Sequence, residues 1–172
     1  MLLSDDGSAL AKVKGFVPIQ SPFWGSPVAD WVLGQQTLSD VSFKLLRDLG
    51  GDEASLRSLA TGIRTNYYGA HWKEIQALWS HISTIAFASW KQNEPWKWDS
   101  LLEWIRNACE DNGHLNDGLV PVDHALYPFA DYIKVPEVDH AVSVMHCVFI
   151  DFDRVRFIKT LLLMIHTKIE SH

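Results

Sequence analysis

Residues 68–86 read YGAHWKEIQALWSHISTIA and carry the most regular apolar spacing in the chain. Large apolar side chains recur there at alternating steps of four and three residues: Tyr68, Trp72, Ile75, Trp79, Ile82 and Ala86. Polar side chains such as Lys73 and Glu74 lie between them. This period is that of an amphipathic α-helix with one buried face. The stretch therefore predicts one long helix, which ends before Pro95 because proline cannot continue it.

Capping residues, glycines and apolar periodicity predict further helices on both sides of this stretch, at residues 27–34, 39–49, 52–63, 99–108, 123–133 and 136–169. The last segment is either one helix or two with a break near residue 153. Residues 148–157 also alternate as a strand would, but a lone strand leaves its backbone hydrogen bonds unsatisfied, so helix is preferred. The sequence thus predicts an all-α fold, a single-domain irregular bundle of about six to seven helices. An irregular N-terminal arm is expected over residues 1–27 and the helical domain over residues 28–172.

Size and composition favour one globular domain. The chain has 172 residues, of which 47% are hydrophobic and 21% are charged. No apolar run approaches the roughly 18 residues that a membrane span needs. The two cysteines, Cys109 and Cys147, are too few for a disulfide framework. We therefore expect a cytoplasmic protein that does not bind membranes.

Negative charge is concentrated in one part of the chain. Residues 107–153 hold nine carboxylates and one lysine, a net charge of −8, whereas the whole chain carries −6. Such a surface repels nucleic acid, whose phosphates require lysine and arginine. It attracts basic proteins and speeds their encounter. The charge pattern therefore predicts a protein partner with a basic surface.

Side chains that could carry chemistry do not form a recognisable motif. Asp139, His146 and Asp153 share one helical stripe, but successive members lie about 10 Å apart, too far for one metal ion. The sequence neighbours Asp123–His124 and Asp139–His140 point about 100° apart on a helix, so their acids are interpreted as helix-start residues. There is no Gly-x-Ser-x-Gly elbow and no glycine-rich phosphate loop. The sequence therefore predicts no enzyme, no catalytic residue, no metal site and no cofactor.

Tryptophans around Pro95 complete the predicted binding surface. Trp90, Trp96, Trp98 and Trp104 cannot all face one core, and at least one ring of Trp96 and Trp98 is expected to be partly exposed. Exposed tryptophans often anchor protein interfaces. The predicted partner-binding residues are Glu110, Asp111, Asp117, Asp123, Asp131, Glu137, Asp139, Trp96 and Trp98.

In general character, a small acidic helical chain of this kind resembles bacterial immunity proteins and other inhibitors of toxic enzymes. The resemblance implies a non-catalytic, antitoxin-type inhibitor that covers the basic active site of a cognate toxin. The alternative is a helical-bundle enzyme or a small-molecule or metal receptor. Its pocket would be lined by Trp79, Trp104 and Tyr68, with His71 or His146 as the polar group. A homodimer through the C-terminal helix is compatible with either interpretation.

Overall fold

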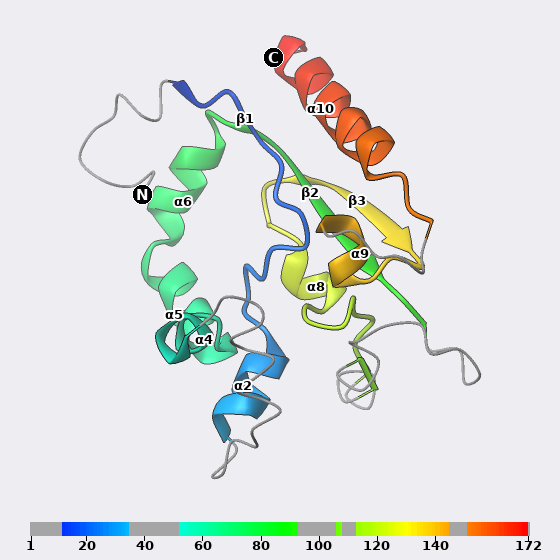
Figure 1. Ribbon diagram of the computed structural model, residues 1–172. Helices are drawn as coiled ribbons and strands as arrows, with labels where there is room; N and C mark the ends of the chain where they lie inside the picture. The colour runs from blue at the N-terminus through cyan, green and yellow to red at the C-terminus, as the bar shows by residue number, and fades with distance from the viewer. Residues whose placement is uncertain (1–11, 35–51, 93–105, 108–112, 145–150, 172) are drawn as a thin grey trace.

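The protein has an α/β fold built on a parallel sheet. The computed structural model describes residues 12–34, 52–92, 106–107, 113–144 and 151–171. Within these ranges three strands pair in the order β1-β2-β3, and both pairs are parallel (Figure 1). The strands are β1 Gly15–Phe16, β2 Ser83–Trp90 and β3 Asp131–Pro136. The prediction of an all-α bundle is therefore wrong.

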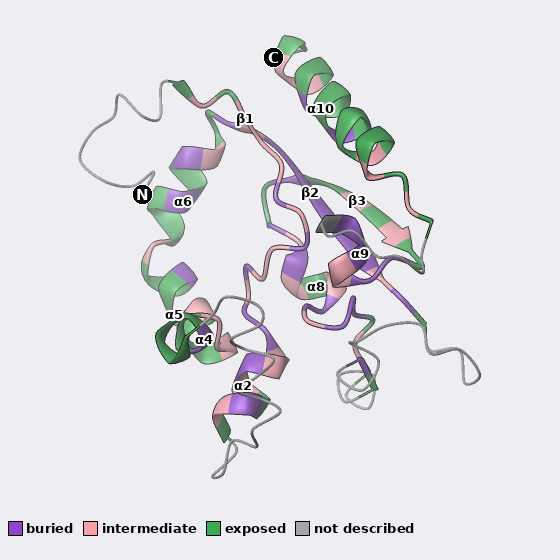
Figure 2. Cartoon of the chain, viewed as in Figure 1, coloured by how far each residue is buried: buried purple, intermediate pink, exposed green. Residues whose placement is uncertain are grey.

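The central strand β2 lies partly inside the stretch that predicts one long helix. Its sequence is STIAFASW, and all six residues between its two ends are buried (Figure 2). A strand covered on both faces reads as a continuous apolar run and not as an alternating one. Ile82 and Ala86 also fit a helical period, so periodicity alone could not distinguish the two structures. The helix α6 Trp72–Trp79 ends just before this run begins.

The chain before β2 forms four helices among the described residues, which in Figure 1 run from the bottom of the view up its left side: α2 Pro27–Gly34, α4 Glu53–Ser58, α5 Thr61–Ala70 and α6. The predicted helix start at Pro27 is confirmed, and so is the Asp52 cap, whose Oδ1 accepts the Ser55 N–H at 2.7 Å. That hydrogen bond lowers the pKa of Asp52. The predicted helix over 52–63 is two helices, because the chain turns at Leu59 and Ala60.

After β2 the described helices are α8 Val122–Ala125, α9 His140–Val144 and α10 Arg154–Glu170. The helix predicted over 123–133 ends at Ala125, and its second half contributes to β3. Of the two alternatives for the C-terminal segment, the break near 153 is correct, since Asp153 caps α10 by accepting the Arg156 N–H at 2.9 Å. The predicted helix at 39–49 lies outside the described residues, as does that at 99–108 apart from 106–107.

An aromatic cluster fastens the N-terminal segment to the helices and to the loop before β3. Tyr127 is 1% exposed, and its ring centroid lies 4.4 Å from Trp79 and 4.8 Å from Phe23. Tyr68 packs on the same cluster. Such ring pairs contribute about 0.5–1.5 kcal/mol each beyond the area that they bury. Burial also raises the pKa of the Tyr127 phenol, which stays neutral.

Gly25 permits a close approach of two backbone segments. Its φ is 87°, and a Cβ there would lie 2.6 Å from the Cα of Thr61 and 2.9 Å from the carbonyl oxygen of Leu59. We expect Gly25→Ala to lower the free energy of unfolding by roughly 2–4 kcal/mol, because neither backbone segment can yield easily. Urea denaturation followed by circular dichroism measures the change.

Gly62→Ala is the matched control for this prediction. Gly62 lies in α5, and a Cβ there would meet nothing within 4 Å. Alanine should therefore raise the free energy of unfolding by about 0.5–1 kcal/mol. Equal stability of the two variants would contradict the close packing at Gly25.

Candidate functional site

A tight turn places Asp117 beside the end of β2. The Lys91 N–H donates to the carbonyl oxygen of Asn116 at 3.1 Å, which holds the turn against the strand. The Asn116 side chain accepts the Gly118 N–H at 2.9 Å, and Gly118 has a φ of 103°, which suits glycine. Asp117 is 1% exposed, so the turn carries its carboxylate into the interior.

Both oxygens of the Asp117 carboxylate have partners. Oδ1 accepts the N–H groups of Leu119 at 2.9 Å and Val120 at 2.8 Å. Oδ2 lies 2.8 Å from Nδ1 of His140, close enough for a charge-assisted hydrogen bond. The backbone bonds fix the carboxylate in one orientation, and that orientation presents Oδ2 to the imidazole.

His140 begins α9, shortly after β3 ends. The His140 N–H donates to the carbonyl oxygen of Asp117 at 2.8 Å, so the two residues are joined by backbone as well as by side chain. The His140 side chain is 27% exposed. Of the residues that the structure describes, no hydroxyl or thiol is hydrogen-bonded to its Nε2. Because a carboxylate can only accept, Nδ1 carries the proton in this contact, and the neutral imidazole then has its lone pair on Nε2, which is the arrangement of a general base.

The pair lies at the carboxyl end of the sheet. Asp117 is held beside the last residue of β2, and His140 follows the last residue of β3. In parallel α/β sheets, ligands bind in the crevice outside the carboxyl ends of the strands. Topology and side-chain chemistry therefore indicate the same place, and we take Asp117 and His140 as the candidate site.

Two of the predicted partner-binding acids are buried. Asp117 and Asp139 are each 1% exposed, and Asp139 accepts the Val142 N–H at 2.9 Å at the start of α9. Neither can form part of an acidic surface. The structure uses both carboxylates internally, to hold the loop that carries His140 and the residues paired with it.

Three other predicted acids are exposed, and two of them have basic neighbours. Asp123 lies 3.4 Å from His114, and Asp131 lies 2.7 Å from Lys168. Glu137 is exposed and has a φ of 61°. The remaining predicted residues lie outside the described ranges: Trp96, Trp98, Glu110 and Asp111. Whether the exposed acids contact a partner stays a prediction.

The sequence interpretation missed the Asp117–His140 pair because Asp139 was the one acid that it weighed as a partner of His140. The true partner is 23 residues earlier in the chain. One signal was present, since Asn116, Asp117 and Gly118 form a strong turn motif directly before an apolar run. That signal indicates a loop at a strand end only when the neighbouring segments are assigned as strands.

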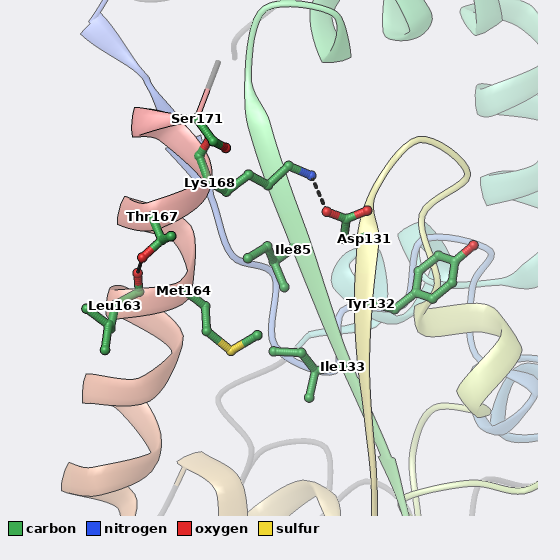
Figure 3. A pocket seen from close by; sticks show the side chains of 9 residues that line it. All are labelled: Ile85, Asp131, Tyr132, Ile133, Leu163, Met164, Thr167, Lys168 and Ser171. Carbon is green, nitrogen blue, oxygen red and sulfur yellow. Dashed lines mark hydrogen bonds and ion pairs between the residues drawn. The ribbon is translucent and has the colours of Figure 1, made fainter.

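A hollow lies near the first residues of β3, away from the candidate site. A groove of about 520 Å³ separates α10 from β3, and in Figure 3 Met164 and Ile133 point toward one another across it. The Lys168–Asp131 ion pair spans it from helix to strand. β3 is 6 residues long, so its two ends lie roughly 16 Å apart at about 3.3 Å per residue. The groove is therefore separate from the candidate site.

Of the pocket expected under the alternative interpretation, the structure describes Tyr68, Trp79 and His71. Tyr68 and Trp79 pack in the aromatic cluster, and His71 Nδ1 lies 3.2 Å from Glu74. Trp104 and His146 lie outside the described ranges. In the part of the chain that the structure places, no group of three His, Cys, Asp or Glu side chains could hold a metal ion. The helices placed there are all too short or too polar to cross a lipid bilayer.

Comparison with known proteins identifies similar structures but no similar sequence family. No family model matches the chain, and no curated protein matches it. The mature form of Bacillus licheniformis lipase BlEst2 is 18% identical with a TM-score of 0.70, covering 92% of this chain and 57% of the lipase. Its propeptide form is 21% identical with a TM-score of 0.63, covering 90% and 31%. The metagenomic carboxyl esterase MGS0156 is 18% identical with a TM-score of 0.72, covering 96% and 52%.

These similarities correct the functional interpretation as well as the fold. The chain resembles the α/β-hydrolase fold of esterases and lipases, and it spans about half the length of the mature lipase and the esterase. The predictions of a non-catalytic, immunity-type inhibitor and of no enzyme activity are therefore wrong. They rested on an all-helical fold and on an acidic surface, and the chain has a parallel sheet and buries two of those acids.

Proposed function

We propose that this chain carries the acid–base pair of a serine-type hydrolase acting on carboxylic esters. The observation that supports the proposal is the 2.8 Å contact between Oδ2 of buried Asp117 and Nδ1 of His140, at the carboxyl end of a parallel sheet. In α/β-hydrolases the three catalytic residues follow in the order serine, acid, histidine. Asp117 and His140 have the order of the last two.

The chemistry assigned to the pair is proton transfer. His140 Nε2 takes the proton of a serine hydroxyl while that oxygen attacks the ester carbonyl carbon. The imidazolium then gives the proton to the departing alkoxide, which leaves as the alcohol, and an acyl-enzyme remains. In the second half, Nε2 takes a proton from water, hydroxide attacks the acyl carbon, and the serine recovers its proton as the acid is released. Asp117 holds the productive tautomer and stabilises the imidazolium.

The substrate class comes from the structural neighbours, which are named as a lipase and a carboxyl esterase. Both names denote cleavage of carboxylic esters. This chain spans only 57% and 52% of those proteins. That it hydrolyses esters by itself is therefore part of the proposal. Among the described residues, no serine is hydrogen-bonded to the His140 side chain, so the nucleophile of the proposed reaction is left to experiment.

Ester hydrolysis combined with active-site labelling tests the proposal. The full chain is incubated with p-nitrophenyl butyrate, and separately with a fluorophosphonate probe followed by peptide mapping. We expect saturable hydrolysis, a label on a single serine, and loss of hydrolysis in proportion to labelling. Hydrolysis no faster than buffer together with no labelled serine would overturn the proposal. The labelled peptide also identifies the nucleophile.

Three expectations from the sequence remain predictions beside this proposal. They are a basic protein partner for the exposed acids, a cytoplasmic location, and a homodimer through the C-terminal helix. The described part of that helix, α10, exposes the apolar side chains of Val155, Leu162 and Leu163, at 64%, 59% and 65%. Sedimentation velocity of the purified chain over a tenfold concentration range tests the dimer.

A further inference from the structure

Gln20, four residues after β1 and next to the isolated bridge between Ile19 and Phe87, has an unusual backbone conformation. Its φ is 48°, a left-handed value that residues with a Cβ rarely adopt. It is 1% exposed, and its N–H donates to the carbonyl oxygen of Phe87 in β2 at 2.8 Å. Such a conformation persists only where surrounding contacts hold it, and such residues cluster at functional sites. The contacts of the buried Gln20 side chain therefore indicate what this strained conformation is for.

The Gln20 side chain connects the sheet to the segment that carries His140. Its Nε2 donates to Oγ of Ser89 in β2 and to the carbonyl oxygen of Asp139 at 3.4 Å. Its Oε1 accepts the Ser143 hydroxyl at 2.6 Å. Asp139 directly precedes His140, and Ser143 also lies 3.2 Å from the carbonyl oxygen of His140. One buried amide thus binds the backbone just before the histidine and a side chain three residues after it.

We propose that Gln20 is a positioning residue that fixes the backbone of His140 so that the imidazole meets Asp117 in one orientation. This inference rests on the proposed function. Asp117 constrains the ring through Nδ1 and the main chain through the His140 N–H, and Gln20 adds a second constraint on the main chain through Asp139 and Ser143. The bond at Nδ1 alone does not set the direction of Nε2, because the ring can still move with its backbone. The backbone contacts alone do not set it either, because the ring can rotate about its side-chain bonds.

The left-handed backbone of Gln20 is explained by the same role. Its buried amide has two donor hydrogens and one acceptor oxygen, and both ends are used. A glycine would adopt the same φ without strain but could not make these bonds. Glycine would fit this position without strain, yet the residue present is glutamine. What glutamine adds is the set of side-chain hydrogen bonds to the segment that carries His140.

Gln20→Gly tests the proposal, because it removes the amide while glycine accepts the backbone conformation. The first readout is the proton NMR signal of His140 Nδ1–H, expected at lower field than the backbone amides and assigned by its absence in His140→Ala. In Gln20→Gly we expect this proton to exchange with solvent at least about tenfold faster, since the imidazole no longer has one orientation. The second readout is ester hydrolysis, where kcat should fall about tenfold with KM unchanged, as for a group that acts through the catalytic geometry.

Glu137→Gly is the matched control. Glu137 also has a positive φ, at 61°, and it lies between β3 and α9, three residues before His140, with its side chain exposed. Glycine there adds the same backbone freedom without removing a buried amide, so the exchange rate and kcat should stay at wild-type values. A wild-type exchange rate in Gln20→Gly would overturn the proposal, and so would equal acceleration in both variants or the absence of the low-field signal from the wild-type protein. The NMR readout needs no nucleophile, so a lack of ester hydrolysis would count against the proposed function and leave this test intact.

Discussion

Replacement of His140 by alanine is expected to lower kcat for p-nitrophenyl butyrate by about 10⁵–10⁶-fold, because the variant has no group to take the serine proton. KM should change little, since Nε2 acts in the transition state and contributes little to ground-state binding. Added imidazole should restore part of the rate by entering the space that the side chain leaves. Steady-state kinetics with and without imidazole measure both effects.

His114→Ala is the control for this experiment. His114 also pairs with a carboxylate, that of Asp123 at 3.4 Å, but its side chain is 38% exposed and it lies in the loop before the Asp117 turn. Its removal should leave kcat within about twofold, as expected for an exposed pair. Comparable losses in the two variants would contradict the assignment of His140. His140→Ala leaves Oδ2 of Asp117 without its partner, which costs about 1–3 kcal/mol, so its free energy of unfolding is measured in parallel.

Features that depend on a few neighbouring residues could be predicted from the sequence. The start of α2 at Pro27 and the cap of α4 by Asp52 were both predicted correctly. The break before α10 was one of two alternatives, and Asp153 provides its cap. For α4 and α10, one turn of chain contains both the cap and the amide that it binds, so the sequence displays the whole interaction.

The sheet could not be predicted in this way, because each strand is stabilised by a segment far along the chain. Phe87 pairs with Ile133, and Thr84 pairs with Phe16, across connections far longer than any periodicity window. β1 is two residues long in a segment that looks like irregular turns. The apolar run at β2 was assigned to a helix because Ile82 and Ala86 continue the helical period of the residues before it. Only residues 148–157 were weighed as a strand, and they were assigned to a helix because a lone strand leaves its backbone unpaired.

The candidate site was missed for the same reason. Asp117 and His140 meet because β2 and β3 run in the same direction and end at the same edge of the sheet. With helices assigned to both segments, nothing brings residues 23 positions apart into contact. The residues themselves are ordinary in sequence, so the chemistry becomes visible only after the topology is known.

Asp117→Asn is expected to lower kcat about 10⁴-fold while the fold is retained. The amide is isosteric, and its oxygen can still accept the N–H groups of Leu119 and Val120. Its NH₂ group then faces His140 Nδ1 in place of Oδ2 and donates to it. The imidazole proton must move to Nε2, where it prevents that nitrogen from accepting the serine proton. The loss therefore comes from the tautomer, and the turn remains intact.

Asp117→Ala and Asp139→Asn separate this effect from the structural role of the carboxylate. Alanine at 117 leaves two backbone N–H groups without an acceptor, so the free energy of unfolding should fall by about 2–4 kcal/mol. Asp139 is equally buried and adjacent to His140, but its Oδ1 accepts the Val142 N–H. Asp139→Asn should therefore keep kcat within about threefold, because it leaves the tautomer unchanged. If Asp117→Asn lost no more activity than Asp139→Asn, the buried carboxylate at 117 would be an element of the turn and not the orienting acid of the pair.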